Sequence, residues 1–320
     1  MLRMHKRERT FLRKGALLAL SFLLMALAFL PAGSVQAADN KWIKQVWSKY
    51  EAYNTKTVDA YDSYMLQLTN KYNTYLKGQN DQLAELESIV LEDQKKWNEK
   101  FAADLAELKK RYEGNRDLRS ALNDFDRAIN PNSLSSAMGL YTRAADRSLL
   151  NSTMGIYDRA IDDSVISSYM AEYKKATNPN SIGSSAYSLH KTVSDNFISS
   201  PMYELMKSSS TNYVSSPVFD YSRGKISKAK AQKQYSKLYQ QYTAQISRDM
   251  AKYKQEISRT AQTSELNIQA LYLKTVSALE TQRNETLQSI SDLRKKISGE
   301  GLTWEPLLVA PVEGVKASGK

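Results

Sequence analysis

Two long stretches of the chain carry apolar residues at a regular helical spacing. In residues 40–113 and again in residues 228–298, an apolar side chain recurs about every 3.6 residues, with polar residues between. This spacing lies nearer an 11-residue repeat than a heptad. Neither stretch contains proline, and Gly78 is the only glycine in the two stretches. The pattern therefore predicts two long amphipathic helices.

A few polar residues fall on the apolar beat of each stretch. Counting them as members of the stripe keeps the helical period unbroken along both stretches. We therefore expect them to face the same side as their apolar neighbours. They are Thr57, Gln79, Gln94, Ser264, Thr275, Gln282 and Thr286.

The two predicted helices have nearly equal lengths and the same period, and each must bury its stripe. This favours mutual packing. At about 1.5 Å per residue, each arm is on the order of 100 Å long. We predict a long antiparallel helical hairpin of two arms of roughly 70 residues, with Ile43 near Ile297 and Tyr112 near Tyr235. The alternative is parallel oligomerisation of several chains through each stripe.

Between the arms, the pattern changes to seven consecutive 16-residue units, which fill residues 118–229 without an insertion. The first position of each unit is aliphatic, the third is serine, and the fifth and eighth are mostly apolar. The tenth position is always basic. The third-position serines are Ser120, Ser136, Ser152, Ser168, Ser184, Ser200 and Ser216. The tenth-position cations are Arg127, Arg143, Arg159, Lys175, Lys191, Lys207 and Arg223.

Helix-capping chemistry explains most of this repeat. Serine is a favoured N-cap, and the fifth, eighth and twelfth positions then share one face of a short helix of roughly nine residues. A cation at the tenth position lies in the last helical turn and complements the helix dipole. Turn residues end each unit. We predict one short helix and a return segment per unit, stacked as a solenoid-like head that caps the arms. A mainly helical solenoid is preferred to one with short strands.

The N-terminal residues 1–37 are predicted to be a signal peptide. Basic residues precede an apolar run at residues 16–30, which is shorter than the roughly 20 residues a membrane-spanning helix needs. Small residues Val35 and Ala37 then mark a cleavage site. The alternative is a retained membrane anchor. Cleavage removes six basic residues and one acid, so the net charge falls from +11 to +6.

The mature chain is therefore expected to contain an N-terminal arm at 38–117, the repeats at 118–229, a C-terminal arm at 230–298 and a flexible tail at 299–320. Apolar residues in the tail, Trp304 among them, would allow it to pack back onto an arm. We expect the protein to be secreted and associated with the cell envelope. The chain has no cysteine, so its stability cannot depend on disulfides.

The sequence offers little support for catalysis. It contains no glycine-rich phosphate loop, and the mature chain has one histidine, His190, at a repeat position whose residue type varies widely. Such variation is typical of a surface position, so a Ser-His-Asp triad is not expected. The carboxylate pairs Asp162–Asp163 and Asp124/Asp126 are interpreted as helix-end charges in preference to a calcium site. No metal or cofactor is predicted, and the abundant tyrosines are interpreted as packing residues in preference to sugar-binding platforms.

These observations favour an exported, non-enzymatic structural or binding protein that presents its repeats to envelope polymers or protein partners. The tenth-position cations are the candidate binding residues, and an anionic wall polymer is their candidate ligand. If the helices stack at about 8–10 Å, seven charges would follow roughly 50–60 Å of one face. The alternatives are a membrane-active, pore-forming helical protein and a wall-acting enzyme with a carboxylate site. Nucleic acid is not an expected partner, and self-association through the arms is a further option.

Overall fold

The computed structural model describes residues 40–307, which are mainly helical and contain no strand. The predicted signal peptide and the end of the tail, residues 308–320, lie outside the described residues. The two predicted long helices are confirmed as α2 (Asn40–Arg111) and α10 (Lys228–Ser298). One short helix per repeat unit is also confirmed. The short helices are α3 (Arg119–Ala128), α4 (Ala137–Ala145), α5 (Thr153–Ile161), α6 (Tyr169–Thr177), α7 (Ser185–Val193), α8 (Pro201–Ser209) and α9 (Pro217–Ser222).

The described residues form two compact units, and each long helix contributes to both. The smaller unit contains residues 40–50 and 207–239, and the larger unit contains residues 51–206 and 240–307. In the smaller unit, Trp42 and Val46 of α2 pack with Val218 of α9 and with Tyr235 of α10. The larger unit holds most of the repeat units and the larger apolar core.

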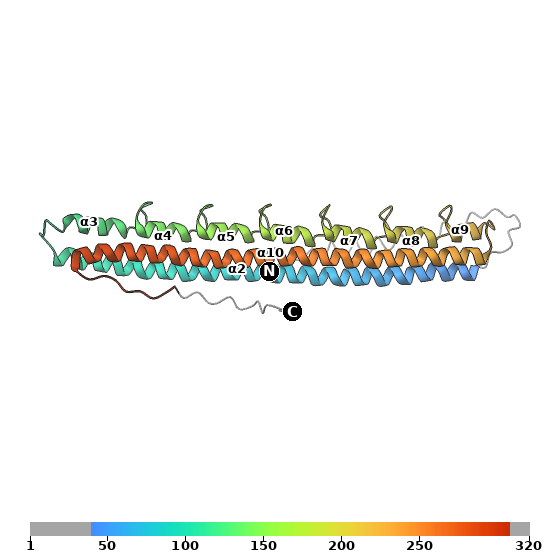
Figure 1. The fold of residues 1–320 in the computed structure, drawn as a ribbon, viewed down its shortest axis with the longest axis horizontal. Helices are drawn as coiled ribbons and strands as arrows, with labels where there is room; N and C mark the ends of the chain where they lie inside the picture. Colours follow the sequence, from blue (N-terminus) through green and yellow to red (C-terminus); the bar gives the residue numbers. More distant parts are fainter. Residues whose placement is uncertain (1–39, 308–320) are drawn as a thin grey trace, which may run out of the picture. The chain divides into compact units, whose positions relative to one another are not determined.

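Within the larger unit, α2 and α10 run in the same direction (Figure 1). Their polar contacts join residues that are always 190 positions apart. A constant difference in residue number requires parallel helices, because antiparallel helices would give a constant sum. The antiparallel hairpin predicted from the sequence is therefore wrong for this unit. The contacts are Tyr53–Thr243, Tyr64–Lys254, Tyr75–Glu265, Asp93–Arg283 and Asp104–Arg294.

The arms are parallel because the repeat units return the chain along them. Phe125 in the first unit meets the ring of Phe101, and His190 in the fifth unit stacks on Tyr61. The repeats therefore run opposite to α2, and 65 repeat residues match 40 residues of α2. Each unit thus advances by about ten α2 residues, or about 15 Å. The short helices follow one another lengthwise along the arms, so the predicted stack of helices in a separate head is wrong for this unit.

The length of the repeat unit matches the period of the arms. Buried positions on α2 recur every 11 residues, as at Leu68, Val90 and Phe101 with Gln79 between them. On α10 the row Ile257, Ile268, Leu279 and Ile290 does the same. Eleven helical residues span about 16 Å, close to the advance of one repeat unit. Each short helix therefore meets an equivalent site on the arms.

The polar stripe residues of the arms are placed as predicted. All are buried except Gln282, which is half-buried. Several contact the repeat units: Gln94 donates a hydrogen bond to the carbonyl of Tyr141, and Thr286 Oγ1 donates to the carbonyl of Ala137. Tyr157 Oη in turn donates to Gln79 Oε1 at 2.9 Å. These residues satisfy polar groups where the third layer meets the arms.

The core tyrosines also have structural partners. Tyr64 and Tyr75 of α2 donate their hydroxyl hydrogens to backbone carbonyls of α10, and Tyr157 is fully buried. Burial raises the pKa of Tyr75 and of Tyr157. These contacts favour packing as the role of these tyrosines.

The junctions between short helices depend on the third-position serine. Ser168 Oγ accepts a hydrogen bond from the amide of Ala171 at 2.9 Å, as an N-cap should, and donates to the carbonyl of Asp162 at 2.6 Å. One hydroxyl thus joins the start of a helix to the end of the preceding one. The same pair of bonds is made by Ser136, Ser152, Ser184, Ser200 and Ser216. The cap prediction is wrong for Ser120, because α3 begins at Arg119 without a side-chain cap.

The junction loops occur in two forms. In the early units, Gly155 approaches the loop so closely that a Cβ there would lie 2.1 Å from the carbonyl oxygen of Leu149. In the later units the corresponding position is aromatic, as at Tyr203. There the loop residue Ser199 has a φ of 70°, in the left-handed region. The backbone of the loop therefore changes where the helix carries a large side chain.

Candidate functional site

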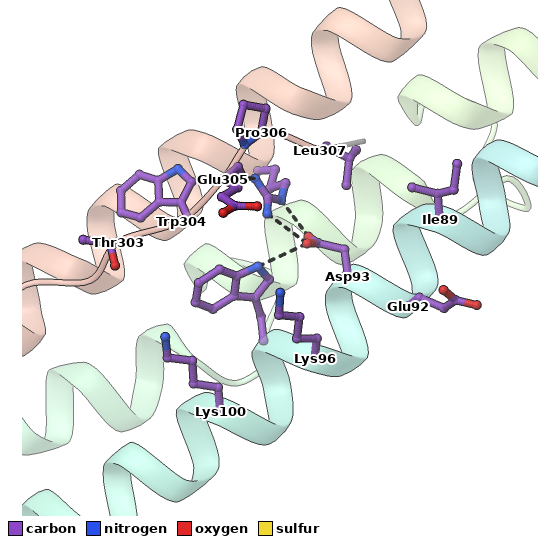
Figure 2. Close-up of a pocket in the computed structure, with 12 residues that line it drawn as sticks. Ile89, Glu92, Asp93, Lys96, Lys100, Thr303, Trp304, Glu305, Pro306 and Leu307 are labelled. Atoms are coloured by element: carbon purple, nitrogen blue, oxygen red, sulfur yellow. Dashed lines mark hydrogen bonds and ion pairs between the residues drawn. The ribbon is translucent and has the colours of Figure 1, made fainter. Parts of the chain in front are cut away.

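The cavity shown in Figure 2 lies between α2, α10 and the chain that follows α10. It has a volume of about 830 Å³. The segment after α10 folds back here: Leu302 N donates to Ser291 Oγ, Trp304 Nε1 donates to Asn284 Oδ1, and Leu307 is buried. The expectation that Trp304 packs back onto an arm is therefore confirmed.

A buried ion pair organises one wall of this cavity. Arg283 donates from Nε and Nη2 to the two carboxylate oxygens of Asp93 at 2.7 and 2.9 Å, and the arginine is 4 % exposed. Asp93 also accepts from Trp97 Nε1 and from Tyr141 Oη. The remaining Arg283 Nη1 donates to the carbonyl of Glu305. Burial, followed by the charge of Asp93, raises the pKa of Tyr141.

This cluster ties four segments together and leaves Asp93 little capacity for chemistry. Its carboxylate is shared among three donors, so it cannot readily act as a base. The twelve lining residues include no histidine, cysteine or serine to serve as a nucleophile or proton carrier. Figure 2 shows Arg283 pointing across to Asp93 beneath the chain at Pro306. We therefore assign the cluster a structural role: it holds residues 299–307 against the arms.

The second candidate is the surface of the short helices that faces away from α2 and α10. We call it the outer face and define it by positions 1, 7 and 10 of the repeat units in the larger unit. Its first-position side chains are aliphatic and 65–94 % exposed, whereas positions 5 and 8 beneath them are buried. The loops that carry them project away from the arms (Figure 1). The exposed first-position residues are Leu134, Leu150, Ile166, Ile182 and Ile198.

The tenth-position cations also lie along the repeat units, but farther apart than predicted. Because the units run lengthwise, neighbouring cations are about 15 Å apart instead of 8–10 Å. Two have local partners: Arg127 pairs with Asp124 at 3.9 Å, and Arg143 donates to the carbonyl of Leu134 at 3.2 Å. The other tenth-position cations of the larger unit are Arg159, Lys175 and Lys191.

The last two cations of the predicted row, Lys207 and Arg223, belong to the smaller unit. Arg223 lies over the ring of Phe219, with its guanidinium carbon 5.5 Å from the ring centroid. Val214, the first-position residue there, is exposed like its counterparts in the larger unit.

The carboxylate pairs considered for metal binding make local interactions. Asp163 accepts from Tyr72 Oη at 2.5 Å and pairs with Lys174 at 2.9 Å. The hydrogen bond from Tyr72 is the main cause that lowers the pKa of Asp163. Asp162 accepts from the amide and hydroxyl of Ser164 in a tight turn. Within residues 40–307, no cluster of three metal-ligating side chains occurs.

His190 is more enclosed than its variable position predicted. It is half-buried between the rings of Tyr61, at 5.6 Å, and Phe197, at 5.7 Å. This packing gives the histidine a structural environment. The described part of the chain also holds no helix that is long and apolar enough to cross a membrane.

Comparisons of the chain with protein-family models, with curated proteins and with solved structures find no match. The functional argument therefore depends on the geometry. The sequence identified the cations but did not predict the exposure of the aliphatic first positions. The signal for them was present: an aliphatic residue recurs at a position that lies outside the helix face defined by positions 5, 8 and 12.

Proposed function

We propose that this protein is an exported, non-enzymatic scaffold or binding protein of the cell envelope. Its long helices form a support on which the repeat units display the outer face to a partner. The signal-peptide pattern of residues 1–37 supports export. The engagement of Asp93, Asp163 and His190 in packing and pairing supports a structural role for the residues that chemistry would most readily use.

The observation that carries the proposal is the repetition of exposed chemistry. Each unit has the same buried core and the same capped junction, and it exposes one aliphatic residue and one cation at about 15 Å intervals. Contiguous or ordered apolar exposure on a protein surface commonly marks an interaction site. A repeated surface of this kind suits an extended or assembled partner better than a small substrate.

An anionic wall polymer is the partner that the cations alone would recognise. The 15 Å spacing is about twice the Debye length at physiological salt, so each cation would act nearly independently. Replacing Arg143, Arg159 and Lys191 with glutamine should then weaken retention on purified cell walls, and added salt should weaken it further. Unchanged retention of this variant would remove the cations from the proposal.

A control variant separates this effect from a general loss of charge. Three exposed lysines on the long helices, changed to glutamine, alter the net charge equally without touching the repeat units. They are Lys95, Lys233 and Lys237. Export itself is tested by N-terminal sequencing of protein from the envelope fraction, which should begin near Ala38. An intact Met1 or a cytoplasmic location would contradict the proposed function, whatever the partner.

A further inference from the structure

The aliphatic row of the outer face has no partner among the described residues of the chain. Single exposed aliphatic residues are ordinary on protein surfaces. Here, however, five occupy the same position of consecutive units, on loops that project to one side (Figure 1). Ile166 is 94 % exposed, although the core directly below it is fully buried. The row therefore requires a partner with apolar surface at a matching interval.

An anionic polymer or lipid headgroup layer does not fit this face well. Such a partner offers nothing to aliphatic side chains at its charged surface, and the same loops carry acids that would repel it. Asp146 and Asp162 each hold a turn beside a first-position residue. A second copy of this chain, in contrast, presents apolar side chains at the same interval of about 15 Å over several units.

We propose that a second copy of this chain covers the outer face, with the two rows of short helices antiparallel. This inference rests on the proposed function, because it names the partner of the outer face. An antiparallel pair has a twofold axis and buries the same surface on both copies. The position of that axis follows from the charges of the seventh and tenth positions.

The charges select one antiparallel register. Glu172 at a seventh position and Lys191 at a tenth position are both exposed, and neither forms an ion pair with another described residue. Pairing Glu172 of one copy with Lys191 of the other fixes the register. In that register Glu204 faces Arg159, because the residue numbers of the two pairs have the same sum. Lys191 and Arg159 belong to units that lack an acid three residues before the cation.

The same register aligns the aliphatic rows. Ile166 of one copy falls opposite Ile198 of the other, within one residue, and Ile182 lies next to its own counterpart at the twofold axis. Charge and apolar patterns, which occupy different repeat positions, thus agree on a single arrangement. A parallel, in-register pair would instead place Glu172 beside Glu172 and leave like charges facing each other.

The oligomeric state of the mature protein tests the proposal. We expect a dimer by analytical ultracentrifugation. Replacing Ile166, Ile182 and Ile198 with serine should give monomers with unchanged helix content, because these side chains make no contact with the core. Glu172→Lys and Lys191→Glu should each weaken the dimer, and the double variant should restore it. A monomeric wild-type protein would overturn the proposal, as would a dimer that the serine variant retains.

Single cysteines test the antiparallel register directly, because the chain contains no cysteine of its own. Ile182→Cys should form an intermolecular disulfide, since its counterpart lies across the axis within the few ångströms that a disulfide requires. Leu150→Cys is equally exposed but lies two units away from the axis, so it should remain reduced. Cross-linking of Leu150→Cys would indicate parallel pairing and contradict the register.

An envelope protein that is monomeric, and whose binding to walls or vesicles is lost in the serine variant, would overturn the second-copy proposal. The proposed function would stand in that case. Absence from the envelope would contradict the proposed function even if the protein were a dimer.

Discussion

The double hydrogen bond of the junction serine makes a prediction that distinguishes it from an ordinary N-cap. Ser168 is 4 % exposed, and its Oγ both accepts from Ala171 N and donates to the carbonyl of Asp162. Loss of the cap costs about 1 kcal/mol. Loss of the donated bond costs about 0.5–1.5 kcal/mol more. Ser168→Ala should therefore destabilise the protein by about 2 kcal/mol in total.

An acidic replacement separates the two bonds. Aspartate is as good an N-cap as serine, so a simple capping role predicts that Ser168→Asp restores stability. A carboxylate cannot donate, however, and would face the Asp162 carbonyl at hydrogen-bond distance. We expect Ser168→Asp to be at least as unstable as Ser168→Ala, whereas Ser168→Thr keeps both bonds and most of the stability.

Urea unfolding followed by far-ultraviolet circular dichroism measures these differences. The neighbouring Ser167 is exposed, so Ser167→Ala is a matched control and should change the free energy of unfolding by less than about 0.5 kcal/mol. Restoration of full stability by Ser168→Asp would refute the double-bond account and leave a simple cap.

Three further predictions concern the core, and chemical or pH-induced unfolding tests each of them. Gly155→Ala should destabilise the protein because its Cβ would meet the Leu149 carbonyl, whereas Gly78→Ala, in open space within a helix, should stabilise it by about 1 kcal/mol; the reverse order would contradict the loop geometry. Burial, with a smaller effect of Asp62, raises the pKa of Tyr61 to about 12, so its stabilising contribution is complete below pH 10 and is lost as the pH rises towards 12; Tyr61→Phe should reduce this alkaline loss. Arg283→Ala should cost about 3–5 kcal/mol because it leaves Asp93 buried without its counter-charge, and a near-neutral effect would show that the pair is not buried in solution.

The sequence predicts the helices of this protein well because their local signals agree. Period, absence of proline and capping residues all indicate the same elements, and even a polar stripe residue such as Gln94 proves to be buried. The periodicity of a stripe contains no information about direction, however. The same 3.6-residue spacing is read along either sense of a helix, so parallel and antiparallel pairing satisfy it equally.

The tertiary contacts that define the site were less predictable. Arg283 and Asp93 are charged residues, which are usually exposed, and their burial depends on a partner 190 residues away. The second bond of Ser168 depends on the fold of a loop that brings the end of the preceding helix to it. Exposure of Ile166 likewise follows from the lengthwise arrangement of the units, whereas its composition alone would favour burial.

The central structural claim is that the repeat units return along two parallel helices, because this arrangement creates the outer face. Spin labels on cysteines at Lys95 and Glu285, both exposed and 190 residues apart, test it by pulsed electron paramagnetic resonance. Parallel helices place these positions side by side, with helix axes about 10 Å apart and the label arms adding to that distance. An antiparallel hairpin would separate them by about 40 residues of helix, or about 60 Å. The short distance is the predicted result, and a separation near 60 Å in a monomeric sample would contradict the account.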